Sequence, residues 1–229
     1  MIKSLTNQFN YLKYFTFIIG VFFAAVGNAQ SIKKVMNKID DFQIIEAEKF
    51  DNQSLDSKRK WHLVTSKKTP KVRKDHDPNH SKGASGNAYL EVLPDTHYND
   101  KTKKIVGKNY SRIGGELGVV SYNVNFESTG KYYVWVRGYG ASVHDNSIHV
   151  GIDGKWPKSS LGLYICENNL NKWAWSSSQF INEENCRSKK RIFFNIKKPG
   201  IHKVMFSMRE DGFEFDKFAI TKQENKKPK

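Results

Sequence analysis

The segment from Gly138 to Asn146 holds several side chains that bind or react with polar molecules. It contains the phenol ring of Tyr139, the imidazole of His144, the carboxylate of Asp145 and the amide of Asn146. Segments held in place by a sheet frequently carry binding residues, so this one is the first candidate for a site. Asp, Asn and Gly are also ordinary turn residues, and a well-capped turn is the alternative.

Strand patterns flank the segment on both sides. Apolar residues occupy every second position from Tyr132 to Val136, and again from Ile148 to Ile152. This period predicts two strands, each with one face in a core. We therefore expect a rigid hairpin that presents Tyr139 and its neighbours at its corner.

The rest of the chain also contains short segments with a strand pattern. Further strands are expected within residues 42–50, 83–94, 119–126, 192–196, 204–208 and 213–221, with Gly and Pro at the turns between them. No helical periodicity interrupts them, so the sequence predicts an all-β fold, a β-sandwich of two antiparallel sheets. Residues 51–83 are basic, contain Pro70 and Pro78, and are expected to form a long irregular connection.

The first residues are typical of a secretory signal peptide. Lys3 and Lys13 precede an apolar run from Phe15 to Val26, and small residues precede Gln30. A membrane-spanning helix needs about 20 apolar residues, more than this run offers. We expect a secreted protein with a signal peptide at 1–29, a lead-in at 30–41, one domain at 42–221 and a basic, disordered tail at 222–229.

The net charge of the chain indicates which class of partner to expect. The chain has 38 Lys and Arg against 23 Asp and Glu, a net charge of +15. Such a protein is expected to prefer acidic partners. Nucleic acid is disfavoured, because the chain has an export signal and no recognisable nucleic-acid-reading motif.

The sequence has two cysteines, Cys166 and Cys186. In an oxidising compartment, two cysteines this close in sequence are expected to form a disulfide. Two unpaired, buried thiols are the alternative.

Four stretches together resemble the carbohydrate-binding modules of families 6 and 35 and their relatives appended to polysaccharide-degrading enzymes. They are IEAEKF, SGNAYLEVL, TGKYYVWVRGYG and PGIHKVMFSMREDGFEFDKFAIT, and the similarity spans most of Phe42 to Thr221. The resemblance implies a jelly-roll β-sandwich, a structural calcium ion and sugar binding by loops or by an exposed sheet face.

The resemblance maps the calcium ligands onto three carboxylates. Glu46 and Glu48 lie on the first expected strand, and Asp216 lies on the closing strand, which in a jelly roll can run beside the first. Backbone carbonyls and water would complete the six to eight oxygen ligands that calcium takes. Alternatively, these are surface carboxylates that balance the charge of the many lysines.

Sugar binding needs an aromatic ring beside a few directional polar groups. Trp173 and Trp175 share a face if their segment is extended, although packing under a long loop is the alternative. The expected ligand residues are Arg137, Tyr139, Asp145, Asn146, Trp173, Trp175, Arg209, Glu210 and Asp211.

Because the guanidinium of arginine matches carboxylate and sulfate groups, the expected ligand is a sulfated or uronic-acid polysaccharide. The expected protein is a non-catalytic binder, accessory to polysaccharide degradation. The alternative is an enzyme on the same sandwich. A lyase would use His144, Tyr139 and Arg137. A glycoside hydrolase would use Asp145 and Glu210.

Overall fold

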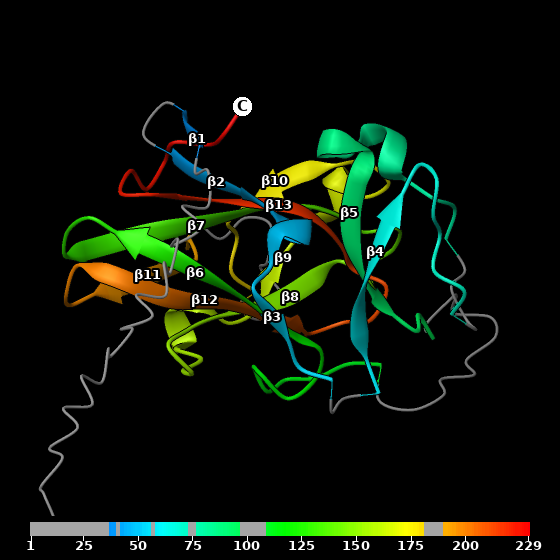
Figure 1. The fold of residues 1–229 in the computed structure, drawn as a ribbon, viewed down its shortest axis with the longest axis horizontal. Coiled ribbons are helices and arrows are strands. Elements are labelled where there is room, and N and C mark those ends of the chain that lie inside the picture. Colours follow the sequence, from blue (N-terminus) through cyan, green and yellow to red (C-terminus); the bar gives the residue numbers. More distant parts are fainter. Residues whose placement is uncertain (1–36, 40–41, 56–57, 73–76, 97–108, 181–189) are drawn as a thin grey trace, which may run out of the picture. The chain divides into compact units, whose positions relative to one another are not determined.

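The computed structural model describes residues 37–39, 42–55, 58–72, 77–96, 109–180 and 190–229 (Figure 1). All of them lie in one compact unit, Val35–Lys229. Within these ranges the chain forms β-strands and short 3-10 turns, without an α-helix. None of the helical segments in the described ranges is long and apolar enough to cross a membrane.

The described strands form two antiparallel sheets. The first contains β1 (Asn37–Ile39), β2 (Phe42–Glu46), β4 (Lys60–Thr65), β5 (Ala88–Leu93), β7 (Gly130–Tyr139), β10 (Ala174–Ser176), β11 (Phe193–Ile196) and β13 (Glu214–Thr221). In this sheet β13, red in Figure 1, pairs with β2, β5 and β7.

The second sheet runs in the order β3, β6, β12, β8, β9. Its strands are β3 (Asn52–Gln53), β6 (Val119–Phe126), β8 (Ser147–Ile152), β9 (Leu163–Tyr164) and β12 (Gly200–Met208). The 3-10 turns are η1 (Ala47–Lys49), η2 (Ser81–Gly83), η3 (Ser85–Asn87), η4 (Lys158–Ser160) and η5 (Glu167–Asn169). The predicted all-β sandwich of two antiparallel sheets is confirmed.

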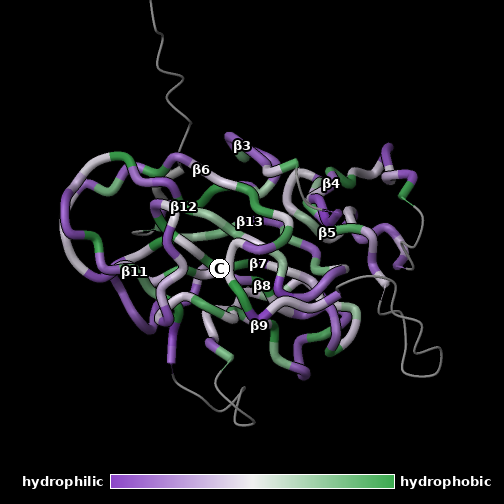
Figure 2. Tube along the Cα trace, turned by 90° about the horizontal axis from the view of Figure 1, so that it is seen from below, coloured by the Kyte–Doolittle hydropathy of each residue, from purple (hydrophilic) through white to green (hydrophobic). Residues whose placement is uncertain are grey.

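One hydrophobic core joins the inner faces of both sheets. Val134 and Val136 of β7 belong to the same buried cluster as Val150 of β8 and Phe206 of β12. Hydropathy accordingly alternates along the strands (Figure 2). Burying every second residue removes apolar surface from water and leaves the opposite side chain free to face outward.

The expected hairpin around Gly138–Asn146 is wrong. β7 pairs with strands of the first sheet, whereas β8 pairs with β9 and β12 of the second. The corner therefore carries the chain from one sheet to the other. Periodicity identifies a strand but not its partner, so the sequence could not show this crossover.

The first expected strand is shorter than predicted. β2 ends at Glu46, and the chain turns into η1, which contains Glu48. Glu46 and Glu48 are therefore not two positions of one strand. The closing strand does run beside the first, since Lys217 of β13 pairs with Glu46 of β2.

The region 51–83 is not wholly irregular, because it contains β3 and β4. Trp61 of β4 packs in the core, while Val64 packs in a separate cluster with Tyr89. Residues three apart on a strand face opposite sides, so apolar residues occupy both faces of β4. The alternation that reveals a strand was lost for this reason.

Candidate functional site

Three of the expected ligand residues meet at the end of β7. Tyr139 and Trp173 contact edge to face, with ring centroids 5.6 Å apart, and Arg137 lies 5.6 Å from the Trp173 ring. His80 completes the group, stacking on Tyr139 at 3.9 Å and accepting a hydrogen bond from Trp173 Nε1 at its carbonyl oxygen, 3.1 Å. We call His80, Arg137, Tyr139 and Trp173 the Trp173 cluster.

A glycine allows the tryptophan to occupy this position. A Cβ atom at Gly83 would lie 2.6 Å from Cδ1 of Trp173, closer than carbon atoms approach without moving. The loop before η3 can therefore pass over the indole only because residue 83 lacks a side chain. His80 and Gly83 were missed by sequence reasoning, since they lie in the basic region 51–83 and carry no spacing signal.

His80 is itself held by a buried carboxylate. Its Nδ1 lies 2.6 Å from Oε1 of Glu214, whose side chain is 1% exposed. Glu214 is the first residue of β13 and pairs in register with Tyr139 of β7. The pairing of these two strands therefore places the carboxylate under the imidazole.

The expected calcium ligands lie on neighbouring elements. Ser85 links two of them, donating from its hydroxyl to Glu46 at 3.0 Å and from its N–H to Asp216 at 2.7 Å. Asp216 also accepts a hydrogen bond from Arg137 at 2.5 Å. Burial raises the pKa of Glu46, and it raises the pKa of Glu48, to which nearby Glu46 and Asp216 contribute further.

Two oxygens in this group fit a cation. Oε2 of Glu46 and Oε2 of Glu48 are buried, and neither has a hydrogen-bond partner among the described residues. A buried carboxylate oxygen without a partner is costly unless a cation or water satisfies it. Glu46 and Glu48 would hold the ion, while Arg137 already neutralises part of the charge of Asp216.

A second acidic group lies near Tyr139. One carboxylate oxygen each of Asp77, Asp95 and Asp145 lies within 4.8 Å of the others, an arrangement that could hold a metal ion. Burial, with a contribution from Asp95, raises the pKa of Asp145 to about 7. Because the three residues come from three separate loops, no sequence spacing could have found Asp77 and Asp95.

The turn between β12 and β13 makes room for this group. Gly212 has a φ of +76°, and a Cβ atom there would lie 2.9 Å from Cγ of Asp95 and 3.2 Å from Cβ of Asp145. A side chain would therefore be strained in its backbone and would push the carboxylates apart.

Arg209 belongs to a different place, a pocket beside β8 and the end of β12, while Glu210 pairs with Arg209 without lining that pocket. It encloses about 450 Å³ and is lined by Tyr110, Arg112, His149, Lys158, Leu161, Gly162, Gln179, Phe180 and Arg209. We call it the basic pocket, because three of its described lining residues are Arg or Lys and none of those described is Asp or Glu.

Arg209 lies between two rings in this pocket. Its guanidinium is 4.8 Å from the ring of Tyr110 and 4.3 Å from that of Phe180. It also donates to the Tyr110 hydroxyl at 3.0 Å and to Glu210 at 3.0 Å. Rings on both sides and fixed hydrogen bonds hold the arginine in one orientation.

His149 forms part of the pocket wall as a neutral ring. Gly162 N–H donates to its Nδ1 at 3.2 Å, and its Nε2 lies 3.0 Å from the carbonyl oxygen of Ser111. These partners leave the proton on Nε2, which donates to Ser111. Burial, with a smaller contribution from Arg209, lowers the pKa of His149 to about 4.

Three expected ligand residues serve the packing of the protein. Trp175 is 8% exposed and packs with Trp135, as the alternative interpretation of this tryptophan holds. Asn146 donates from Nδ2 to the carbonyl of Ile165 at 3.0 Å. Asp211 is fully buried and forms an ion pair with Arg59 at 2.8 Å.

Some sequence predictions fall on residues that the structure does not describe. The signal peptide at 1–29 lies outside the described residues, and so does Cys186. Cys166 lies within them, and its Sγ contacts the Tyr164 hydroxyl at 3.6 Å. The disulfide and the export signal stay predictions.

Comparison with known proteins gives one curated relative and several solved structures. No family model matches the sequence. Uncharacterized protein P23 from Formosa agariphila is 40% identical over 194 residues, which cover 85% of this chain and 47% of that protein. The chain thus spans about half the length of this relative.

The solved structures similar to the chain include two carbohydrate-binding modules. One is a family 35 module from Clostridium thermocellum, with a TM-score of 0.45 and 15% identity, covering 78% of this chain and 96% of that one. The other is a CBM35 from Paenibacillus barcinonensis, with a TM-score of 0.43 and 13% identity, covering 79% and 98%. Family 35 is one of the two families that the sequence motifs resemble.

Proposed function

We propose that this protein is a secreted, non-catalytic carbohydrate-binding protein that recognises an acidic polysaccharide, sulfated or rich in uronic acid. It acts as an accessory to polysaccharide degradation, alone or beside a degrading enzyme. The export signal expected at residues 1–29 supports its place outside the cytoplasm.

The basic pocket is the observation that carries the proposal. Arg112 and Lys158 are exposed, and Phe180 is 41% exposed, so two cations and a ring face solvent together. A sugar ring can lie against Phe180 while its sulfate or carboxylate meets the cations. The excess of Arg and Lys over Asp and Glu among the described lining residues favours an anion over a neutral sugar.

Electrophoresis in gels that contain a polysaccharide tests the proposal. We expect ulvan, carrageenan or alginate to retard the protein, and neutral glycans to retard it little. Replacing both Arg112 and Lys158 by alanine should reduce the retardation at least tenfold in apparent affinity, because two charge-assisted contacts are lost.

The matched control replaces Lys67 and Lys68 by alanine. Both are exposed and stand outside the pocket lining, so this change lowers the net charge equally. Equal weakening in both double variants would mean that only net charge attracts the polysaccharide, and would contradict a site at the basic pocket. Stronger retardation by neutral glycans would contradict the acidic specificity.

Calcium is the proposed structural cofactor, held by Glu46 and Glu48 together with Asp216. When bound, it would neutralise buried carboxylates and tie η1 to the closing strand β13. The protein residues supply two partnerless buried oxygens, and Ser85 orients the carboxylates of Glu46 and Asp216.

A lyase or glycoside hydrolase on the same sandwich is the second candidate. The observation that favours a lyase is the pair of His80 and Glu214, 2.6 Å apart and beside Tyr139, because a carboxylate that orients an imidazole is typical of a general base. The base would take the proton beside the uronate carboxylate, a C=C bond would form as the bond to the leaving sugar oxygen breaks, and the Tyr139 hydroxyl would give that oxygen a proton. Unsaturated product from alginate or ulvan, detected by ultraviolet absorbance and lost in His80→Gln, would favour the enzyme.

A further inference from the structure

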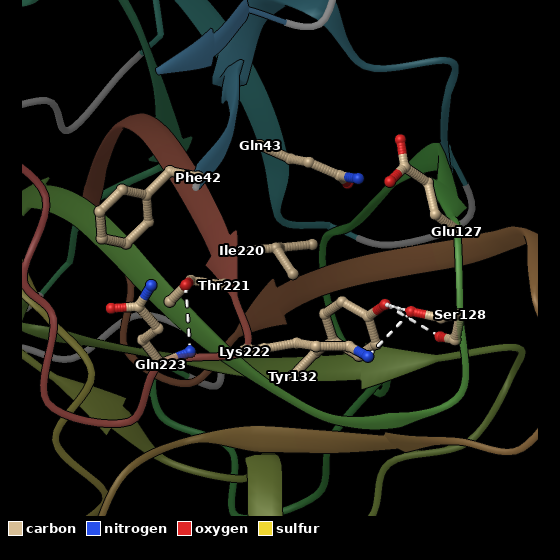
Figure 3. A pocket seen from close by; sticks show the side chains of 9 residues that line it. All are labelled: Phe42, Gln43, Glu127, Ser128, Tyr132, Ile220, Thr221, Lys222 and Gln223. Atoms are coloured by element: carbon tan, nitrogen blue, oxygen red, sulfur yellow. Dashed lines mark hydrogen bonds between the residues drawn. The ribbon is translucent and has the colours of Figure 1, made fainter. Parts of the chain in front are cut away.

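A second cavity opens at the other end of the sandwich from the basic pocket. It encloses about 290 Å³ and is lined by Phe42, Gln43, Glu127, Ser128, Tyr132, Ile220, Thr221, Lys222 and Gln223 (Figure 3). We call it the distal pocket. It takes no part in the binding described above.

Strand register fixes the separation of the two pockets. The distal pocket lies at the start of β12, because Glu127 comes directly after Phe126, the partner of Gly200. The basic pocket lies at the other end of β12, because Arg209 comes directly after the last residue of that strand. The rise of a strand gives about 27 Å for the length of β12. One sugar residue therefore cannot occupy both pockets.

The floor of the distal pocket consists of buried apolar side chains. Phe42, Tyr132 and Ile220 are 3%, 7% and 1% exposed. In Figure 3 Ile220 lies between Gln43 on one side and the pair of Tyr132 and Lys222 on the other. These buried side chains fix the shape of the cavity and leave a small apolar surface, against which the C–H face of a sugar can lie.

The rim is polar and held by hydrogen bonds. Lys222 Nζ donates to Ser128 Oγ at 2.8 Å and to the carbonyl of Thr129 at 3.0 Å, and the Tyr132 hydroxyl donates to the carbonyl of Ser128 at 2.9 Å. Gln43 Nε2 donates to the carbonyl of Asn125 at 3.0 Å. Groups fixed before binding lose little entropy when a ligand arrives.

Charge separates this pocket from the basic one. Its described lining has one carboxylate, Glu127, and one ammonium, Lys222, so the charges of these residues balance. A volume near the lower end of the range for small-molecule sites has room for about one sugar ring. Hydroxyl groups can donate to a carboxylate or amide oxygen and accept from an amine or amide.

We propose that the distal pocket, between the β6–β7 turn and the end of β13, is a second binding site that takes a neutral sugar residue. The inference rests on this pocket alone and holds whether or not the basic pocket binds an acidic glycan. With both sites filled, one molecule can hold two segments of a mixed polysaccharide, and linking two weak sites raises the overall affinity.

Saturation-transfer NMR with the intact protein tests the proposal. The probes are the methyl glycosides of galactose, glucose, mannose and xylose. We expect at least one to receive saturation from the wild type and to keep its signal in the presence of excess alginate, because the two ligands use different pockets.

The test variant combines Gln43→Ala with Glu127→Gln, which removes two polar groups from the rim and leaves the apolar floor in place. Its signal should fall at least fivefold. Glu167→Gln is the control for the loss of a carboxylate, since Glu167 is exposed and lines neither pocket.

Three results would overturn the proposal: no saturation of any of the four glycosides, an unchanged signal in the double variant, or displacement by alginate. The Arg112 and Lys158 double variant separates the two sites. It should lose retardation by acidic glycans and keep the glycoside signal, so failure of one site is distinguishable from failure of the other.

Discussion

At the scale of single residues, orientation decides what each side chain can do. Arg209 is held between Tyr110 and Phe180 at the wall of the basic pocket and is paired with Glu210. Trp173 and Trp175, two positions apart, have different tasks: Trp173 meets Tyr139 and Arg137, while Trp175 packs with Trp135. The residue types at these positions predicted aromatic stacking and the binding of an anion. They did not show which way each side chain faces.

His149 offers a residue-scale prediction. Burial lowers its pKa from 6.5 to about 4, so the folded protein holds the ring neutral. A lowered pKa contributes stability that is present above pH 6.5 and lost as pH falls towards about 4. The ring signals of His149 in an NMR titration should therefore change near pH 4.

His202 serves as the internal control for this titration. Its pKa is raised above 6.5, chiefly by the hydrogen bond with Asp153 at 2.6 Å. The two rings should thus titrate on opposite sides of 6.5. Titration of His149 at its ordinary pKa would show that the wall of the basic pocket is open to water.

At the scale of elements, the first and last strands of the domain depend on each other. β13 pairs with β2, and the carboxylates of Glu46 and Asp216 are joined through Ser85. η1 follows β2 directly and brings Glu48 close to Glu46 and Asp216. For this reason the two carboxylates add to the effect of burial, which raises the pKa of Glu48. A cation here would fasten the closing strand to the start of the domain.

Calcium removal tests this connection. At a calcium concentration about one hundred times its dissociation constant, binding stabilises the fold by roughly 3 kcal/mol. We expect the protein to melt several degrees lower in chelator than in excess calcium, as measured by circular dichroism or calorimetry.

Two variants assign the ion. Glu48→Gln should melt at the same temperature with and without calcium, while Asp145→Asn should keep the difference. Identical melting of the wild type in both conditions would argue against any structural calcium. Loss of the difference in Asp145→Asn alone would assign the ion to Asp77, Asp95 and Asp145 instead.

At the scale of the whole molecule, the described domain presents two pockets of different charge. The basic pocket lies past the end of β12, beside Arg209, and the distal pocket lies beside the turn that faces its start. The net charge of +15 favours approach to any polyanion, while the pockets determine which sugar is held.

Salt separates these two contributions. Exposed charges are screened over about 10 Å at 0.1 M salt and about 3 Å at 1 M. Retardation by alginate or ulvan should therefore fall steeply as salt is raised, whereas the neutral glycoside signal should stay nearly constant. Retardation that resists molar salt would mean that ionic contacts do not hold the acidic chain.

The sequence by itself determined the strands and the class of fold. Alternation over Tyr132–Val136 and Ile148–Ile152 predicted β7 and β8, because side-chain direction along a strand is a local property. It also placed Asp216 on a strand. That this strand runs beside the first one followed only from the resemblance to a jelly roll, and the pairing of β13 with β2 agrees with it.

Only the tertiary structure decided which residues share a site. Alternation gave no partner for β7 or β8, so the corner between them was misread as a hairpin. β4 was missed because apolar residues lie on both of its faces. Asp77 and His80 lie in the loop after β4, whereas Asp95 lies in the loop after β5. Tyr110 and Phe180 meet Arg209 from distant segments. Such contacts depend on how the sheets stack and on where the loops return, and those are properties of the whole chain.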